Sequence, residues 1–137
     1  MSRERKVLII DDDKDLVTTM KVVFESKGFA VSVAYNGKEG SDSLKKKKPD
    51  AIVLDVMMTT LTEGVDFARY LKDSPEYQAI PIVLVTGFPK EMSQLGPEKF
   101  QSILGDDWPA AKLLEKPQDP EQIVAAVEAV LKEQWKP

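Results

Sequence analysis

Two amino acids are absent from this chain of 137 residues: it has no cysteine and no histidine. Without cysteine there is no disulfide, no thiolate nucleophile and no cysteine-ligated zinc. Without histidine there is no imidazole metal ligand, no Ser-His-Asp relay and no general base with an ordinary pKa near neutrality. Any chemistry must therefore use carboxylates, amines, hydroxyls and backbone groups, a set that suits oxygen-preferring cations such as Mg²⁺.

The chain also lacks long apolar runs and an excess of positive charge. Its 19 Lys and Arg stand against 23 Asp and Glu, a net charge of −4, which argues against binding nucleic acid or anionic membranes through bulk charge. Because no apolar run approaches the length of a membrane span or a signal-peptide core, we expect a cytoplasmic protein. The length fits one domain, residues 1–137 with a core from about 5 to 134.

Short β-branched runs alternate with amphipathic segments along the chain. Strands are expected at 7–10, 30–34, 51–54, 82–85 and 113–114, and helices at 15–27, 36–47, 65–72 and 119–135. Three of the strand runs are apolar throughout, which is typical of parallel strands covered on both faces. The alternation predicts an α/β domain with one parallel sheet and helices on both faces.

Local signals define the ends and faces of these helices. In the first helix, one apolar face is expected from Leu16, Met20, Val23 and Phe24, and Gly28 is placed to end the helix in the left-handed conformation.

The proline-rich stretch from 87 to 110 predicts an irregular fourth helix. Four lysines at 45–48 are typical of a solvated helix end, with a partner-docking patch as the alternative.

Polar residues follow the predicted strands, at the edge where a parallel sheet binds its ligands. They are Asp11, Asp12 and Asp13, then Asp55, then Thr86 with Gly87, then Glu115, Lys116 and Pro117. Each alone has a structural explanation; Asp13, for example, is expected to cap the helix that follows it. Together, Asp11, Asp12 and Asp55 would repel one another unless a cation such as Mg²⁺ lay between them. Such a site with a lysine and a hydroxyl is complementary to a phosphoryl group.

Four ordered segments carry a family resemblance over nearly the whole chain. VLIIDDD (7–13), DAIVLDVMM (50–58), IVLVTG (82–87) and EKP (115–117) resemble the receiver domain of bacterial two-component response regulators, the CheY-like superfamily. The resemblance implies a flavodoxin-like, doubly wound sheet of five parallel strands in the order 2-1-3-4-5. It also implies a phosphoprotein that takes part in phosphorelay signal transduction.

The resemblance assigns roles by position. Asp55 corresponds to the phosphoacceptor, which forms an aspartyl phosphate. Asp12 corresponds to the direct ligand of Mg²⁺, Asp11 to a partner that acts partly through water, and the backbone carbonyl of Met57 to the third protein ligand.

The remaining matches surround the phosphoryl group. Thr86 and Lys116 are expected to contact its oxygens, and the small Gly87 leaves it an entry path. The Lys116–Pro117 peptide bond is expected to be cis.

Several positions depart from the family pattern. Thr59 stands where a proline is common, and Leu113 replaces an aromatic ring that changes rotamer on activation, so the output switch must differ. Met57 and Phe88 hold the two positions that tune dephosphorylation. Since neither side chain can orient an attacking water, we expect a long-lived phosphoryl group.

The function implied is Mg²⁺-dependent transfer of a phosphoryl group from a partner phosphohistidine to Asp55, which switches a protein-interaction surface. The donor would be a sensor histidine kinase or a phosphotransfer protein, and the output a downstream protein or effector domain, with no direct nucleic-acid or membrane contact. Apart from self-phosphorylation and slow autodephosphorylation, no enzyme activity is expected.

Three alternatives compete with this interpretation. A pseudo-receiver would keep the fold as an interaction module without phosphorylation. A haloacid-dehalogenase-type phosphohydrolase would need a carboxylate at Met57, and a flavodoxin would need a glycine- and hydroxyl-rich loop at 11–13. Whether the chain is a single-domain regulator or part of a longer one stays open.

Overall fold

The structure is a computed structural model that describes residues 5–55, 66–67, 69–71, 73–86, 110–115 and 119–134. At Leu84, Thr86, 110–115 and 133–134 the description covers the backbone alone. Of the sites expected from the sequence, Met57, Gly87, Phe88, Lys116 and Pro117 lie outside these ranges, as does most of the expected irregular helix at 87–110.

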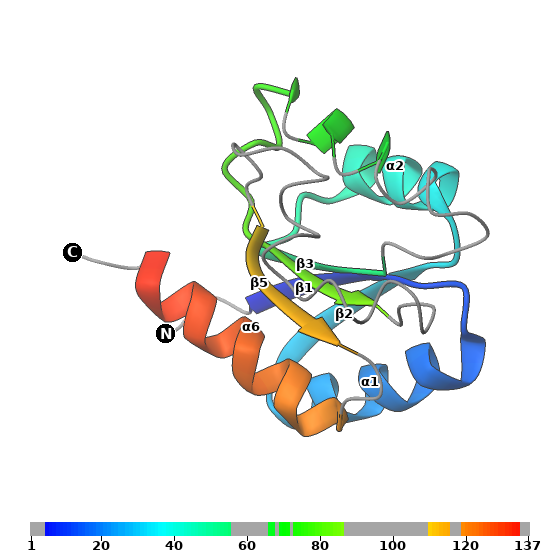
Figure 1. The fold of residues 1–137 in the computed structure, drawn as a ribbon. Coiled ribbons are helices and arrows are strands. Elements are labelled where there is room, and N and C mark those ends of the chain that lie inside the picture. The colour runs from blue at the N-terminus through cyan, green and yellow to red at the C-terminus, as the bar shows by residue number, and fades with distance from the viewer. Residues whose placement is uncertain are drawn as a thin grey trace.

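A parallel sheet forms the centre of the molecule (Figure 1). Its strands are β1 (Arg5–Ile10), β2 (Phe29–Ala34), β3 (Ala51–Leu54), β4 (Ile82–Thr86) and β5 (Ala110–Glu115). They lie in the order β2-β1-β3-β4-β5, and every neighbouring pair is parallel. The expected α/β class with a parallel sheet is confirmed, and the order of β2, β1, β3 and β4 is the one that the resemblance implied.

Helices cover the sheet. They are α1 (Lys14–Ser26), α2 (Gly37–Lys46) and α6 (Pro120–Gln134), and residues 66–67, 69–71 and 73 are also helical. Figure 1 shows α1 and α6 on one face of the sheet and α2 on the other. This arrangement explains why β1 and β3 are apolar without alternation, because each of their residues from Val7 to Ile10 and from Ala51 to Leu54 is buried.

The core on the α1 and α6 face is built from the alternation of side chains along the strands and the three-to-four-residue spacing along the helices. Alternate residues of the central strands point to this face and meet apolar residues spaced three and four apart on the two helices. The fully buried members from α1 are Val17, Met20 and Phe24. Leu16 and Val23, which the sequence placed on the same buried face, are partly buried at its margin. The inward face of α1 is therefore rotated slightly towards Val17.

The predicted ends of α1 are confirmed. Asp13 is its N-cap, and the Asp13 side chain accepts a hydrogen bond from the Leu16 N–H at 3.1 Å. Gly28 has φ +90°, the left-handed conformation that a Cβ disfavours, and it turns the chain from the end of α1 into β2.

Candidate functional site

Two adjacent strands end at the same level and place their next residues side by side. Ile10 of β1 is in register with Leu54 of β3, so Asp11 and Asp55 leave the sheet together. The Asp55 N–H donates to the Ile10 carbonyl at 2.9 Å, and the Asp11 N–H donates to the Ala34 carbonyl at 3.1 Å. The ladder hydrogen bonds thus hold the backbone of both aspartates beyond the ends of the strands.

The loop after β1 is ordered by its own aspartates. The Asp13 N–H donates to Asp11 Oδ1 at 3.0 Å, which orients the Asp11 carboxylate. The Asp13 carboxylate in turn caps α1. The cap was predicted from the sequence, but the contact from Asp13 to Asp11 was not. It belongs to a recognised type of turn, in which an aspartate side chain accepts the backbone N–H two residues further on.

Three carboxylates meet at this edge. One carboxylate oxygen from each of Asp11, Asp12 and Asp55 lies within 4.8 Å of the others. Asp11 and Asp55 each keep only 2% of their surface exposed, whereas Asp12 is exposed. Buried carboxylates this close destabilise each other when ionised, and a divalent cation offsets that repulsion. The oxygen-only donor set, with two members buried and one open to solvent, fits Mg²⁺, which keeps several of its waters.

The backbone brings a fourth expected residue to the same edge. Thr86 is the last residue of β4, the strand beside β3, and it is in register with Glu115 at the end of β5. Lys116, which follows Glu115, lies outside the described residues, as do Met57, Gly87, Phe88 and Pro117. Leu113 lies in β5 opposite Leu84. The structure therefore joins Asp11, Asp12 and Asp55, and it leaves the expected roles of the other residues as predictions.

Near the start of α1, the Lys14 side chain lies over the Tyr35 ring, a contact that was not predicted from the sequence. The Lys14 ammonium is 5.4 Å from the centre of the Tyr35 ring. Tyr35 follows β2, and its N–H donates to the Glu39 carboxylate at 2.9 Å. The neighbouring Asn36 caps α2 by accepting from the Glu39 N–H at 2.8 Å. This reciprocal cap holds the end of β2 against the start of α2.

In the part of the chain that the structure describes, no helix has both the length and the apolarity to cross a bilayer. This finding is in keeping with the absence of long apolar runs in the sequence.

Comparisons with known proteins agree with the strand order and the acidic edge. The family model of the response regulator receiver domain matches residues 7–128. The alkaline phosphatase synthesis transcriptional regulatory protein PhoP of Bacillus subtilis is 31% identical over 128 residues, which cover 93% of this chain and 49% of that protein. The chain thus spans about half the length of the first curated relatives that it matches.

Other relatives match along almost their whole length. Protein PilH of Pseudomonas aeruginosa is 29% identical over 92% of this chain and 97% of its own. The crystal structure of a two-component response regulator from Clostridium difficile superposes with a TM-score of 0.77 at 26% identity, over 97% of this chain and all of that one. With a family model that matches most of its length, this chain belongs to the response regulator receiver domains of two-component signalling systems.

Proposed function

We propose that Asp55 is phosphorylated and that Asp11 and Asp12 hold the Mg²⁺ that this transfer requires. The observation that carries the proposal is the meeting of three carboxylates within 4.8 Å, two of them buried, at the carboxyl edge of the sheet. A solvated acidic surface does not need to bury two of its members. A site that must hold a divalent cation does, because the attraction between carboxylate and cation is stronger away from water.

The proposed step is an in-line transfer to a carboxylate. An oxygen of Asp55 forms a bond to phosphorus while the bond between phosphorus and the donor's imidazole nitrogen breaks, and that electron pair leaves with the imidazole. Because this chain has no histidine, the phosphohistidine belongs to another protein or another domain. Bound Mg²⁺ would supply positive charge to the phosphoryl oxygens.

Further residues, most of them outside the described ranges, complete the proposal. We assign the Met57 carbonyl to the cation, and the Thr86 hydroxyl and Lys116 ammonium to phosphoryl oxygens. We further assign to Gly87 an open approach for the phosphoryl group, and to the Lys116–Pro117 peptide bond the cis form that the receiver family implies. These roles rest on the positions of the residues within the receiver family.

The module proposed is one receiver domain, with a core from about 5 to 134, whose partners are a histidine kinase or phosphotransfer protein and a downstream target. The relatives include both a protein twice as long and one of nearly equal length. We therefore propose that phosphorylation alters a protein contact, made either with a separate target or with an attached effector domain.

The test is the intact mass of the protein after incubation with acetyl phosphate and Mg²⁺. Wild type should gain one phosphoryl group, and Asp55→Asn should gain none. Asp50→Asn is the matched control, since Asp50 lies at the other end of β3 and its carboxylate accepts the Lys6 N–H at 2.8 Å. This control should be phosphorylated like wild type. An unmodified wild type would instead identify a pseudo-receiver, which acts through protein contacts alone.

A further inference from the structure

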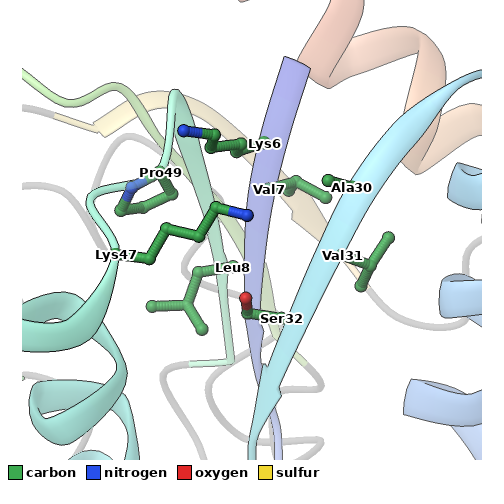
Figure 2. A pocket seen from close by; sticks show the side chains of 8 residues that line it. All are labelled: Lys6, Val7, Leu8, Ala30, Val31, Ser32, Lys47 and Pro49. Atoms are coloured by element: carbon green, nitrogen blue, oxygen red, sulfur yellow. The ribbon is translucent and has the colours of Figure 1, made fainter. Parts of the chain in front are cut away.

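A small recess opens at the amino end of the sheet, at the opposite edge from the three carboxylates (Figure 2). It has a volume of about 40 Å³ and lies between β1, β2 and the segment that leads from α2 to β3. Leu8 of β1 and Ala30 and Ser32 of β2 line its sheet side. Their register, Lys6 with Ala30 and Leu8 with Ser32, places all of them on the face that α2 covers.

The recess exists because the helix ends before the strands do. α2 stops at Lys46, and the chain then extends through Lys47 to the buried Pro49. Beyond that point, the edge strand β2 presents only the small side chains of Ala30 and Ser32 on this face. No large side chain of α2 is available to fill the space above them.

Two lysines border the recess. In Figure 2 the Lys47 side chain extends from the end of α2 towards β1, and the Lys6 side chain runs from β1 towards Pro49. Among the described residues, the ion pair found is between Arg5 and Glu128. Neither Lys6 nor Lys47 takes part in it. The nearby Asp50 carboxylate accepts the backbone N–H of Lys6.

Positive charge continues beyond the recess. Lys45, Lys46 and Lys48 are exposed beside Lys47, so four consecutive cations border this edge of a chain whose net charge is −4. Four like charges in a row repel one another, and a partner of opposite charge relieves that repulsion. A polyanion would be steered to this edge and away from the carboxylates at the other.

The lining of the recess indicates the kind of anion. Leu8, Ala30 and Pro49 give it apolar walls, and the two ammonium groups lie at its border. A carboxylate on a short hydrocarbon stem matches both parts, whereas a fully hydrated phosphate would leave water against the apolar wall. The volume exceeds the roughly 10–15 Å³ that a cavity needs to hold one water, and so admits a group of a few heavy atoms.

We propose that this edge is a docking site for an acidic segment of a partner protein. One Asp or Glu side chain of the segment enters the recess between Lys6 and Lys47, and its neighbours pair with Lys45, Lys46 and Lys48. Because the site lies at the opposite edge of the sheet from Asp55, it stays accessible whether or not the carboxylate site is occupied. The proposal is independent of the proposed phosphorylation and can fail without affecting it.

The experiment measures the fluorescence anisotropy of a labelled oligoglutamate peptide with the full chain at fixed ionic strength. Lys47→Gln and Lys6→Gln should each weaken binding about threefold to tenfold, as expected for partly desolvated charge pairs. Lys21→Gln removes an exposed lysine from α1 and should change the affinity less than about twofold. If this control weakens binding as much as the two variants, only the overall charge matters and the proposal is wrong.

A steric variant tests the recess apart from its charge. Ala30→Val adds two methyl groups to the lining, keeps every lysine and suits a strand. Weaker peptide binding with an unchanged circular dichroism spectrum supports the recess; unchanged binding overturns its role. A competition experiment completes the test. Duplex DNA or phosphatidylserine vesicles are added at the same concentration of negative charge as the peptide. If they displace the peptide, the surface binds polyanions in general, which contradicts a specific protein partner.

Discussion

Three consecutive aspartates at the end of β1 have three different environments. Asp11 is buried and its carboxylate accepts the Asp13 N–H, Asp12 is exposed, and Asp13 caps α1. Only Asp11 and Asp12 join Asp55 in the acidic cluster. The sequence predicted Asp13 as the cap and Asp11 and Asp12 as members of the cluster. The structure adds that Asp11 is buried and Asp12 exposed, a difference that depends on where the strand ends and the helix begins.

Replacing Asp12 separates the effect of repulsion from that of metal binding. Asp12→Asn removes one of three neighbouring negative charges, so without Mg²⁺ the free energy of unfolding should rise by about 1 kcal/mol. The same change should weaken Mg²⁺ binding by at least about tenfold, because one ligand loses its charge. Urea denaturation and titration calorimetry measure the two effects.

Asp13→Asn is the matched control for this prediction. Asparagine caps a helix as well as aspartate does, so α1 should be unaffected. Since Asp13 is outside the acidic cluster, Mg²⁺ affinity should fall far less than in Asp12→Asn. Equal losses in the two variants would mean that the cation senses net charge and is not bound by particular carboxylates.

The residue two positions after Asp55 should determine how long the phosphoryl group lasts. Met57 cannot orient an attacking water, whereas an amide can, so Met57→Asn should speed the loss of the phosphoryl group by several-fold to about tenfold. The decline of the phosphorylated mass after removal of the donor measures the rate. Met58→Asn changes the adjacent residue and should leave the rate unaltered; a faster loss in that variant would point to a general loosening of the loop.

At the scale of elements, two glycines act in different ways. Gly40 lies inside α2, where a Cβ would come within 2.8 Å of Ile10 Cδ1 and 3.1 Å of Phe67 Cζ. Gly28 has open space around its Cβ position but a φ of +90°. The first allows α2 to approach β1 closely, and the second turns the chain after α1.

Substitution should separate packing from backbone strain. Gly40→Ala gains about 1 kcal/mol of helix propensity but overfills a buried contact at a cost of about 1–3 kcal/mol, so a net loss of stability is expected. Gly28→Ala should lose about 1 kcal/mol through its backbone alone. Chemical denaturation checks both. A smaller side chain at Ile10, as in Ile10→Val, should relieve the loss at Gly40 and not the loss at Gly28; equal relief at both sites would refute this distinction.

At the scale of the molecule, charge is divided between the two edges of the sheet. The carboxyl edge gathers the buried aspartates, and the lysines of 45–48 stand at the end of α2 near the amino edge. A ligand that binds only the folded chain stabilises it by mass action. The acidic edge should therefore make stability depend on divalent cations.

Thermal denaturation with and without Mg²⁺ tests this dependence. At a Mg²⁺ concentration about a hundred times the dissociation constant, the free energy of unfolding should rise by about 2.7 kcal/mol. NaCl at the same ionic strength should give a smaller rise, and a variant lacking the Asp11 and Asp12 charges should respond to both salts alike. A Mg²⁺ effect that survives in that variant would place the binding elsewhere.

Much of this architecture follows from local pattern. The β-branched runs, the cap at Asp13 and the turn at Gly28 are set by interactions within a few residues and were found where the sequence predicted them. The second helix was predicted from residue 36, and the structure shows that Asn36 is its cap. The position of the acidic site follows as well, because the ends of neighbouring parallel strands meet at one edge. Strand ends were less accurate: β5 begins at Ala110, three residues before the apolar pair that signalled it.

The sequence by itself determined the class of the fold, the order of its elements and the residues at the strand ends, since those depend on spacing along the chain. Only the tertiary structure decided that Asp11 and Asp55 are buried while Asp12 is exposed, that Val17 lies deeper than Leu16, and that Gly40 allows helix and strand to touch. It also brought Lys6 and Lys47 together around one recess. Such contacts join residues far apart in the chain, and their distances depend on how whole elements pack, which no local pattern encodes.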